Sequence, residues 1–130
     1  APDPATGEMR EIYRFDRGVP HVPTALVHEG LLFMWADDGI VTCVSAATGK
    51  EHWKKRIGGN FSGSPVCVGG RLYCVSEDGE VVVLAASDDY ELLGRVNLGA
   101  PSRSTPAVIG GRLYLRTYSQ LFALGPAEGK

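Results

Sequence analysis

The chain consists of short apolar runs separated by polar turns, and no stretch shows the period of a helix. Near its middle, the runs "SPVCV", "RLYCVS" and "EVVVLAA" alternate with turns at Gly69-Gly70 and at Glu77–Gly79. Paired glycines supply the positive φ angles of a tight hairpin, and Asp-Gly suits a type I′ turn. A fourth run follows within "SDDYELLGRVNLG". The pattern predicts four short antiparallel strands in about 41 residues, which is the unit of a β-propeller blade.

The same unit recurs along the chain, with equivalent residues 40 to 42 positions apart. Three sets mark the repeat: Gly30, Gly70 and Gly111; Pro23, Pro65 and Pro106; and Phe33, Tyr73 and Tyr114. The sequence therefore predicts an all-β fold, a β-propeller segment of about three four-stranded antiparallel blades. We expect one domain over residues 1–130, with blades near 20–60, 61–100 and 101–130. Residues 5–15 are expected to form a preceding or closing fourth strand.

The turn "SAATGKEHW" (45–53) carries a more specific signal. A strand that leads into Thr-Gly-Lys and then a tryptophan resembles the PQQ-like β-propeller repeat family. That family includes quinoprotein alcohol dehydrogenases and the outer-membrane-protein assembly lipoprotein. Thr48, Gly49, Lys50 and Trp53 match its motif, whereas Ser45 stands where the family prefers Asp. The resemblance implies that Trp53 packs between blades as a structural residue.

The resemblance does not extend to the quinone site of the dehydrogenases. Those enzymes use a vicinal Cys-Cys disulfide, a calcium site with Glu and Asn, and a catalytic Asp. Cys43, Cys67 and Cys74 include no adjacent pair, and no matching set of Glu, Asn and Asp is found. We therefore expect no cofactor, metal ligand or catalytic residue in this chain. The cysteines are interpreted as small packed side chains.

Three blades do not close a ring, because propellers usually have about 4–8 blades. The chain begins with an expected fourth strand, Thr6–Phe15, and ends after an expected third strand, Leu121–Leu124. One alternative is that the remaining blades belong to a longer parent chain. The final "AEGK" (127–130), which starts the Thr-Gly-Lys phrase again, favours this alternative. The other is a homo-oligomer, a dimer that completes six blades through head-to-tail contacts.

Composition narrows the possible partners. The 130 residues carry a net charge of −2, with 44% hydrophobic and 22% charged residues. This balance gives no strong attraction to nucleic acid, and no apolar run reaches the roughly 18–20 residues that span a bilayer.

The three histidines lack the spacing of metal ligands, and the acidic turns lack the pattern of a calcium-binding loop. No signal peptide is visible in the sequence.

Loops provide the functional candidates. In a four-stranded blade, the connection between the second and third strands lies on the same face of the disc as the connection to the next blade. Loops on a rigid scaffold carry function, and aromatic and arginine side chains dominate protein interfaces. The candidate partner-binding residues on this face are His21, Asn60, Phe61, Arg103 and Tyr118.

These observations favour a non-enzymatic propeller scaffold or protein-binding module. One alternative is a portion of a PQQ- and calcium-dependent oxidoreductase whose site lies in other blades. Another is a ligand-sensing domain of a receptor-type protein. The family resemblance implies a periplasmic or other extracytoplasmic location and a protein partner.

Overall fold

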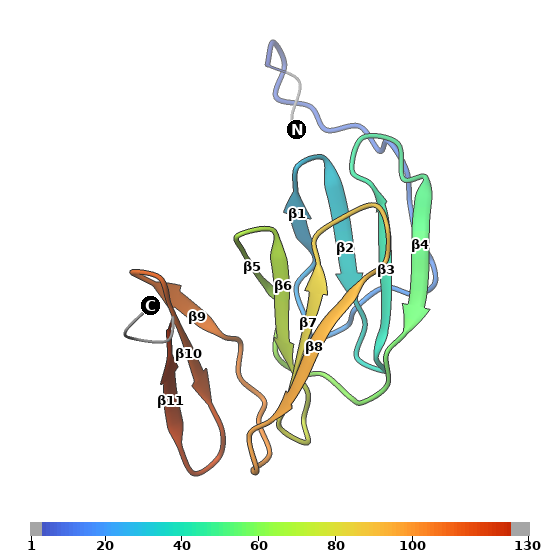
Figure 1. Cartoon of the computed structure of the whole chain (residues 1–130). Coiled ribbons are helices and arrows are strands. Elements are labelled where there is room, and N and C mark those ends of the chain that lie inside the picture. Colours follow the sequence, from blue (N-terminus) through green and yellow to red (C-terminus); the bar gives the residue numbers. More distant parts are fainter. Residues whose placement is uncertain (1–3, 126–130) are drawn as a thin grey trace.

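The computed structural model describes residues 4–125 of the chain. This part contains eleven β-strands, joined by turns and loops, and no helix (Figure 1). Accordingly, no helix long and apolar enough to cross a membrane occurs in this part. The strands are β1 (Leu26–His28), β2 (Leu31–Trp35), β3 (Ile40–Ser45), β4 (Glu51–Arg56), β5 (Val66–Val68), β6 (Arg71–Val75), β7 (Glu80–Ala85), β8 (Leu92–Asn97), β9 (Ala107–Ile109), β10 (Arg112–Arg116) and β11 (Leu121–Leu124).

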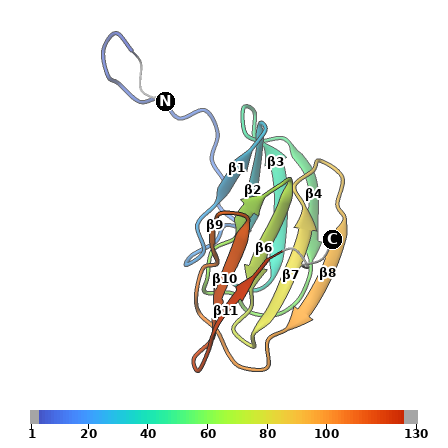
Figure 2. The same ribbon diagram turned by 60° about the vertical axis from the view of Figure 1, so that its left-hand side comes forward.

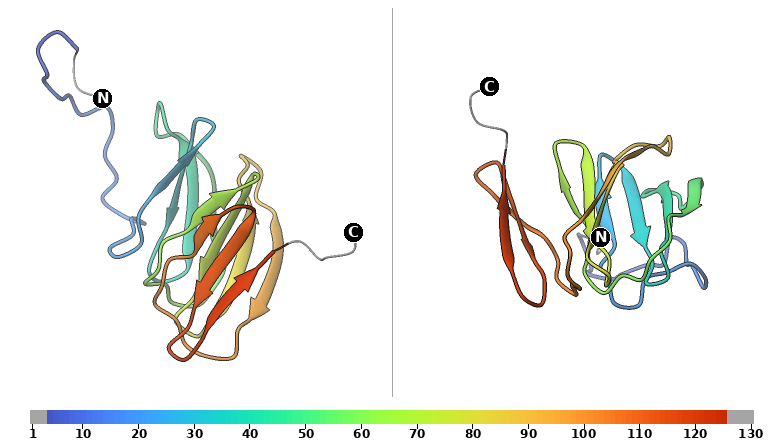
Figure 3. Two further views of the ribbon diagram at one scale, coloured as in Figure 1. Left: turned by 90° about the vertical axis from the view of Figure 1, so that its left-hand side faces the viewer. Right: turned by 60° about the horizontal axis from the view of Figure 1, so that its bottom comes forward.

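The strands form three antiparallel sheets, in the spatial orders β1-β2-β3-β4, β5-β6-β7-β8 and β11-β10-β9. We call them blades 1, 2 and 3. The sheets stack one behind another (Figure 2), with the N-terminal segment and β11 at opposite ends of the stack (Figure 3). This arrangement confirms the predicted all-β fold and partial propeller. Blade 3 has three strands within the described residues, and the "AEGK" phrase lies outside them.

Two-residue turns with positive φ join the first two strands of the blades. Gly69 and Gly70, between β5 and β6, have φ angles of 56° and 73°. A type I′ turn needs positive φ at both central positions, which glycine adopts without a steric penalty. Blade 1 builds the same kind of turn with Glu29 at φ 47° and Gly30 at φ 76°. The predicted tight hairpin at Gly69-Gly70 is therefore confirmed.

The turn between β6 and β7 is not the type I′ turn expected at Asp78-Gly79. Gly79 has a φ of 87°, whereas Asp78 is not among the described residues with positive φ. The amide of Gly79 donates to the carbonyl of Ser76 at 2.9 Å, and the Ser76 amide donates to the carbonyl of Glu80 at 2.8 Å. This is a three-residue hairpin loop that ends in a left-handed glycine. The expectation was wrong because the loop is one residue longer than a type I′ turn allows.

Gly79 also permits close packing of two chain segments, which gives a testable prediction. A Cβ at this position would lie 1.9 Å from the carbonyl oxygen of Ala100, whereas a Cβ at Gly69 would meet nothing within 4 Å. Both residues have positive φ, and asparagine tolerates that conformation. We expect Gly79→Asn to lower the free energy of unfolding by about 2 kcal/mol or more in urea titrations. Gly69→Asn is the matched control, with an expected loss below about 1 kcal/mol. Equal losses in the two variants would contradict the close approach.

The larger apolar core lies between blades 1 and 2. Aromatic rings dominate its blade 1 side: Trp35 and Phe33 are fully buried, and the Trp35 ring meets Phe61 edge to face at 5.4 Å between centroids. Its buried members are Phe33, Trp35, Val41, Cys43, Trp53, Ile57, Phe61, Leu72, Cys74, Val82 and Leu84. The alternation of side chains along each strand sends every second residue of blade 2 into this contact.

The contact between blades 2 and 3 is thinner. Three buried residues, Val75, Val81 and Leu115, form its centre, and partly buried neighbours surround them. The remaining face of blade 3 is turned away from blade 2 and carries Leu121, which is 70% exposed. Burial therefore decreases along the stack from blade 1 toward blade 3.

Equivalent hydroxyl residues link successive blades just before the first strand of each. The amide of Thr24 donates to the hydroxyl of Ser64 at 2.8 Å, and the amide of Ser64 donates to the hydroxyl of Thr105 at 2.9 Å. These residues are 40 and 41 positions apart, which matches the sequence period. Pro65 follows Ser64, whereas Pro23 precedes Thr24. Pro23 and Pro65, which are 42 residues apart in sequence, are therefore not structurally equivalent.

The Thr-Gly-Lys turn closes the β3–β4 hairpin of blade 1. The hydroxyl of Thr48 accepts a hydrogen bond from the amide of Lys50 at 3.2 Å. Gly49, at φ 79°, donates its amide to the carbonyl of Ser45 at 2.8 Å. The turn sets the start of β4 and with it the position of Trp53 on that strand.

Trp53 packs between blades 1 and 2. Its Nε1 donates to the carbonyl of Ser87 at 2.9 Å, and its ring meets Tyr90 edge to face at 5.3 Å between centroids. Both partners lie in the connection between β7 and β8 of blade 2. Only 9% of Trp53 is exposed, so the indole joins the two blades through apolar burial and one satisfied hydrogen bond.

Trp53→Ala is expected to lower the free energy of unfolding by about 3–5 kcal/mol, because it leaves a cavity at the blade contact and removes the stronger of the two hydrogen bonds to the Ser87 carbonyl, the other coming from the Cys43 thiol. Urea unfolding monitored by circular dichroism measures this change. Tyr118→Ala serves as the control, since Tyr118 is 64% exposed and its removal should stay within about 0.5 kcal/mol. An unchanged midpoint for Trp53→Ala would refute the structural role of the indole.

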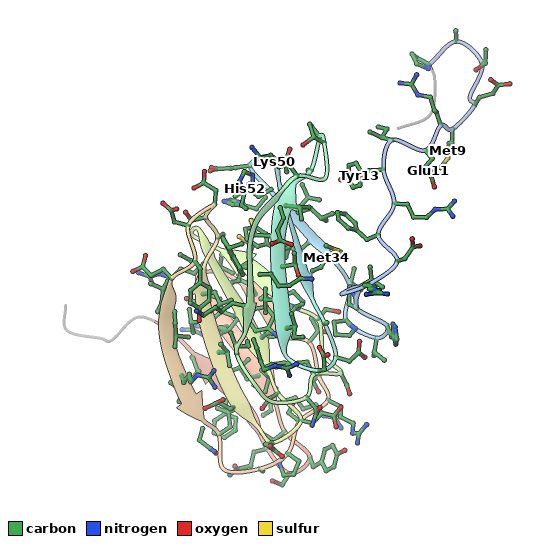
Figure 4. All side chains as sticks on the ribbon, turned by 90° about the vertical axis from the view of Figure 1, so that its right-hand side faces the viewer. Met9, Glu11, Tyr13, Met34, Lys50 and His52 are labelled. Carbon is green, nitrogen blue, oxygen red and sulfur yellow. The ribbon has the colours of Figure 1, made fainter. Side chains whose placement is uncertain are left out.

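Residues 6–15, expected as a fourth strand, form no strand in this structure. The segment runs beside the outer flank of blade 1 (Figure 4). There the hydroxyl of Tyr13 donates to the carbonyl of Ala46 at 2.6 Å, and its ring lies against Gly49. A strand needs the free edge of a partner strand. The edge of β11 lies at the opposite end of the stack from this segment (Figure 3). Met9 and Ile12 consequently remain 81% and 68% exposed.

The three cysteines are free thiols. Cys67 pairs with Leu72 across the β5–β6 hairpin and not with Cys74, as expected from the two-residue turn. Burial raises the pKa of Cys43 to about 11, and the charge of Asp88 adds to the effect. Burial raises the pKa of Cys74 as well. Since the thiolate is the reactive form, Cys43 and Cys74 act as packed side chains at neutral pH.

Candidate protein-interaction surface

The connections at one end of the blades form a continuous strip, which we call the loop face. It comprises residues 19–23, 36–39, 57–63, 76–79, 98–104 and 117–120, on the lower side of Figure 1. Backbone hydrogen bonds join one loop to the next. The Glu77 amide donates to the Asn60 carbonyl at 2.7 Å, the Ser102 amide to the Glu77 carbonyl at 3.0 Å, and the Tyr118 amide to the Pro101 carbonyl at 2.9 Å. These bonds hold the loops of neighbouring blades in fixed positions.

Four polar side chains interact where blade 2 meets blade 3 on this face. Nε of Arg103 donates to the hydroxyl of Tyr118 at 2.8 Å, and its Nη2 lies 3.5 Å from Oε1 of Glu77. The other carboxylate oxygen of Glu77 accepts a hydrogen bond from the Ser62 hydroxyl at 2.5 Å. The hydrogen bond to Tyr118, followed by the charge of Glu77, raises the pKa of Arg103. We call these residues the Arg103 cluster.

The Arg103 cluster combines accessibility with order. The side chain of Arg103 is 61% exposed, and Tyr118 is 64% exposed. Exposed ion pairs contribute little to stability, so the contact with Glu77 serves mainly to orient the guanidinium. Arginine and tyrosine are the residues that most often dominate binding energy in protein interfaces. The cluster presents both of them on loops held by backbone hydrogen bonds.

The other two exposed candidates, His21 and Asn60, are held by backbone contacts. The amide of His21 donates to Oδ1 of Asp37 at 2.6 Å, which fixes the chain entering blade 1 against its β2–β3 loop. Asn60 contributes its carbonyl to the link with Glu77. The structure thus brings Arg103 and Tyr118 into contact, whereas His21 belongs to the blade 1 end of the strip.

Phe61 does not belong to the exposed surface, contrary to the sequence interpretation. Its side chain is 1% exposed and packs against Trp35. Its amide donates to the carbonyl of Asp37 at 2.8 Å, so the loop turns the ring inward under blade 1. A large apolar ring gains more from burial between two blades than from an exposed loop position. Phe61 is therefore part of the core and not a partner-binding residue.

Sequence reasoning did not select Ser62, which completes the Arg103 cluster. Ser62 follows Phe61 and lies 41 residues before Arg103, so the repeat places both at the same position in successive blades. That equivalence was the available signal. A lone serine in a loop has no chemical signature of its own, because serine is common in turns.

The described residues offer no obvious site for a metal ion. Within residues 4–125, no group of three or more His, Cys, Asp or Glu side chains lies close enough to hold one. The loop face is instead a surface of hydrogen-bonding groups and aromatic edges.

The family model for the outer membrane protein assembly factor BamB matches residues 2–130. The chain belongs to this family. The structure is similar to BamB from Moraxella catarrhalis, with a TM-score of 0.63 and 20% sequence identity over 77% of this chain and 30% of that one. It is also similar to the quinohemoprotein alcohol dehydrogenase ADHIIG from Pseudomonas putida HK5, with a TM-score of 0.60 and 18% identity over 79% of this chain and 17% of that one. No curated protein matches the sequence.

These comparisons support the PQQ-like repeat family and the propeller fold. At such sequence identities the structural likeness establishes the fold alone. The chain spans less than a third of the length of the BamB structure and a smaller share of the dehydrogenase.

Proposed function

We propose that this chain is a non-enzymatic scaffold that binds a protein partner through its loop face. The Arg103 cluster is the observation that carries this proposal. It places an exposed arginine and an exposed tyrosine in hydrogen-bond contact across two loops whose backbones are fixed. A rigid surface of this kind loses little conformational entropy on binding.

Membership of the BamB family supports a partner from the assembly of outer membrane proteins, and thus a periplasmic or other extracytoplasmic location. The guanidinium of Arg103 is planar and has donors left beyond those used by Tyr118 and Glu77. It therefore suits a carboxylate or backbone carbonyl on the partner. The ring of Tyr118 supplies apolar area beside it.

Replacing Tyr118 with a photo-crosslinking phenylalanine analogue should give one discrete protein adduct in cells that express the chain. Val96 is the matched control site, because it is 58% exposed but lies on β8 outside the loop face. Arg103→Ala should reduce the Tyr118 adduct at least about tenfold, since an interface arginine commonly contributes 2 kcal/mol or more. It should leave the free energy of unfolding within about 0.5 kcal/mol.

Equal adducts from positions 118 and 96, or an adduct that Arg103→Ala leaves unchanged, would refute the proposed docking face. A large loss of stability in Arg103→Ala would instead make Arg103 a structural residue.

We further propose that blade 3 is completed by a strand from outside the described residues. The candidates are the remaining blades of a parent chain and a second copy of this chain. In a dimer of six blades, the 6–15 segment of one copy would pair with β11 of the other. The apolar residues Met9 and Ile12 on this segment and Leu121 and Leu124 on β11 are exposed in the single chain, which supports such pairing.

Light scattering after size exclusion distinguishes the two candidates. A discrete species of twice 13.9 kDa is expected if the 130-residue chain completes its own ring. Ile12→Asp should then convert it to monomer, because it places a charge in the new strand contact. A monomer in the unmodified chain would rule out the dimer and favour the parent-chain alternative.

The alternative of a PQQ- and calcium-dependent oxidoreductase is favoured by one observation, the structural likeness to a quinohemoprotein alcohol dehydrogenase. Because the quinone site of such an enzyme would lie in other blades, titration of the longer parent protein with pyrroloquinoline quinone and calcium separates the two functions. Saturable, calcium-dependent quenching of tryptophan fluorescence would favour the oxidoreductase, and its absence would favour the scaffold. A ligand-sensing role in a receptor-type protein remains a further candidate that sequence flanking the chain would identify.

A further inference from the structure

A cavity of about 500 Å³ lies between blades 2 and 3, at the end of the blades away from the loop face. It lies beside the β5–β6 and β9–β10 hairpins, and both of these hairpins are on the upper side of Figure 1. Its lining residues are Val68, Arg71, Tyr73, Val108, Gly111, Arg112, Leu113, Leu124 and Gly125. Sites for small molecules in proteins commonly measure about 300–1,000 Å³. The cavity therefore has the size of a ligand site.

Apolar side chains from both blades form its walls. Val68 comes from β5 of blade 2, whereas Val108, Leu113 and Leu124 come from the three strands of blade 3. Val108 and Leu124 are 39% and 44% exposed, so part of this apolar surface still faces solvent. An apolar ligand would be stabilised by removing that surface from water.

Positive charge at the cavity has no acidic counterpart within the described part of the chain. The pentapeptide "GGRLY" occurs in blades 2 and 3 and places Arg71 and Arg112 at the start of β6 and β10. Within residues 4–125, neither guanidinium takes part in an ion pair or side-chain hydrogen bond, in contrast to Arg95 and Arg103. Among the described residues, none that lines the cavity is Asp or Glu. Each free guanidinium has five donors arranged to bind a carboxylate or phosphate.

The geometry of β6 directs Arg71 toward the cavity. Leu72 and Cys74 point into the contact with blade 1, so the alternating residues Arg71 and Tyr73 face blade 3. The Tyr73 hydroxyl forms no hydrogen bond with the described residues and is a second donor on the same wall. Arg112 adds its charge at the blade 3 side of the opening.

We propose that this inter-blade cavity binds a small amphiphilic anion. Its apolar body lies between the valine and leucine walls, and its carboxylate or phosphate headgroup binds Arg71, with Arg112 at the rim. The site is separate from the docking role of the loop face and does not depend on it.

Calorimetric titration of the 130-residue chain with decanoate, decyl phosphate and decyltrimethylammonium tests the proposal. Decanoate and decyl phosphate should each bind at one saturable site, whereas the cation should not. Arg71→Gln should weaken binding of the anions by about tenfold or more, because a hydrogen bond to a charged group contributes about 1.5–3 kcal/mol. Arg112→Gln should weaken binding to a smaller extent. The preferred headgroup shows whether the site suits a carboxylate or a phosphate.

Arg116→Gln is the matched control, since it removes one positive charge from the same strand as Arg112 but does not line the cavity. Its affinity should equal that of the unmodified chain. Val108→Trp keeps every charge and fills the cavity, so it should abolish binding of both anions. Amide chemical shifts should change at Gly111 and Leu113 and not on the loop face.

Three results would overturn the proposal. Equal binding of the cation would show adsorption to exposed apolar surface. Equal weakening by Arg116→Gln and Arg71→Gln would show general charge attraction. Undiminished binding to Val108→Trp, in a variant whose circular dichroism spectrum is unchanged, would place the ligand outside the cavity.

Discussion

The middle sheet is buried on both faces by neighbouring sheets, and the order of the whole stack depends on this burial. Blade 1 supplies Phe33 and Trp35 to one face, and blade 3 supplies Leu115 to the other. Strand hydrogen bonds hold each sheet together, but they do not fix one sheet relative to the next. The side chains at the two contacts do so, because tightly packed interiors resist sliding. The contact between blades 1 and 2 buries more apolar residues than the contact between blades 2 and 3, so blades 1 and 2 are held together more tightly.

The loop face and the inter-blade cavity lie at opposite ends of the stacked blades, and the spacing of the blades differs between these two ends. Where the blades lie close together, backbone hydrogen bonds such as Glu77 to Asn60 join one loop to the next and orient Arg103. Where blades 2 and 3 separate, apolar residues stay partly uncovered, and Arg71 forms no ion pair with any carboxylate of the described residues. One end of the stack thus suits a protein surface, and the other suits a small molecule. Neither feature requires an enzyme's set of acids and bases.

Local sequence was enough to predict features that one hairpin determines by itself. The Gly69-Gly70 turn and the positions of Phe33, Tyr73 and Tyr114 on the second strands follow from turn chemistry and the repeat. Features that depend on a neighbouring blade were harder to predict from the local sequence. Phe61 appears in sequence as an exposed loop aromatic, and only the position of Trp35 beneath it explains its burial.

The 6–15 segment illustrates the same limit. Its sequence carries the Thr-Gly phrase of a fourth strand, yet strand formation depends on an available edge and not on the segment alone. The Arg103 cluster was predicted in part, because arginine and tyrosine are recognisable anchors, whereas Ser62 acquires a role only through its contact with Glu77.

The hydrogen bonds from Thr24 to Ser64 and from Ser64 to Thr105 all run in one direction, from an amide to the hydroxyl of the following blade. The two ends of a blade array are therefore chemically different, like the ends of a polar filament. A designer who inserts, deletes or shuffles blades must keep Ser or Thr at this position in every incoming unit. A blade joined in the reverse sense would lose this hydrogen bond at each contact, at a cost of about 0.5–1.5 kcal/mol, so the array favours one direction.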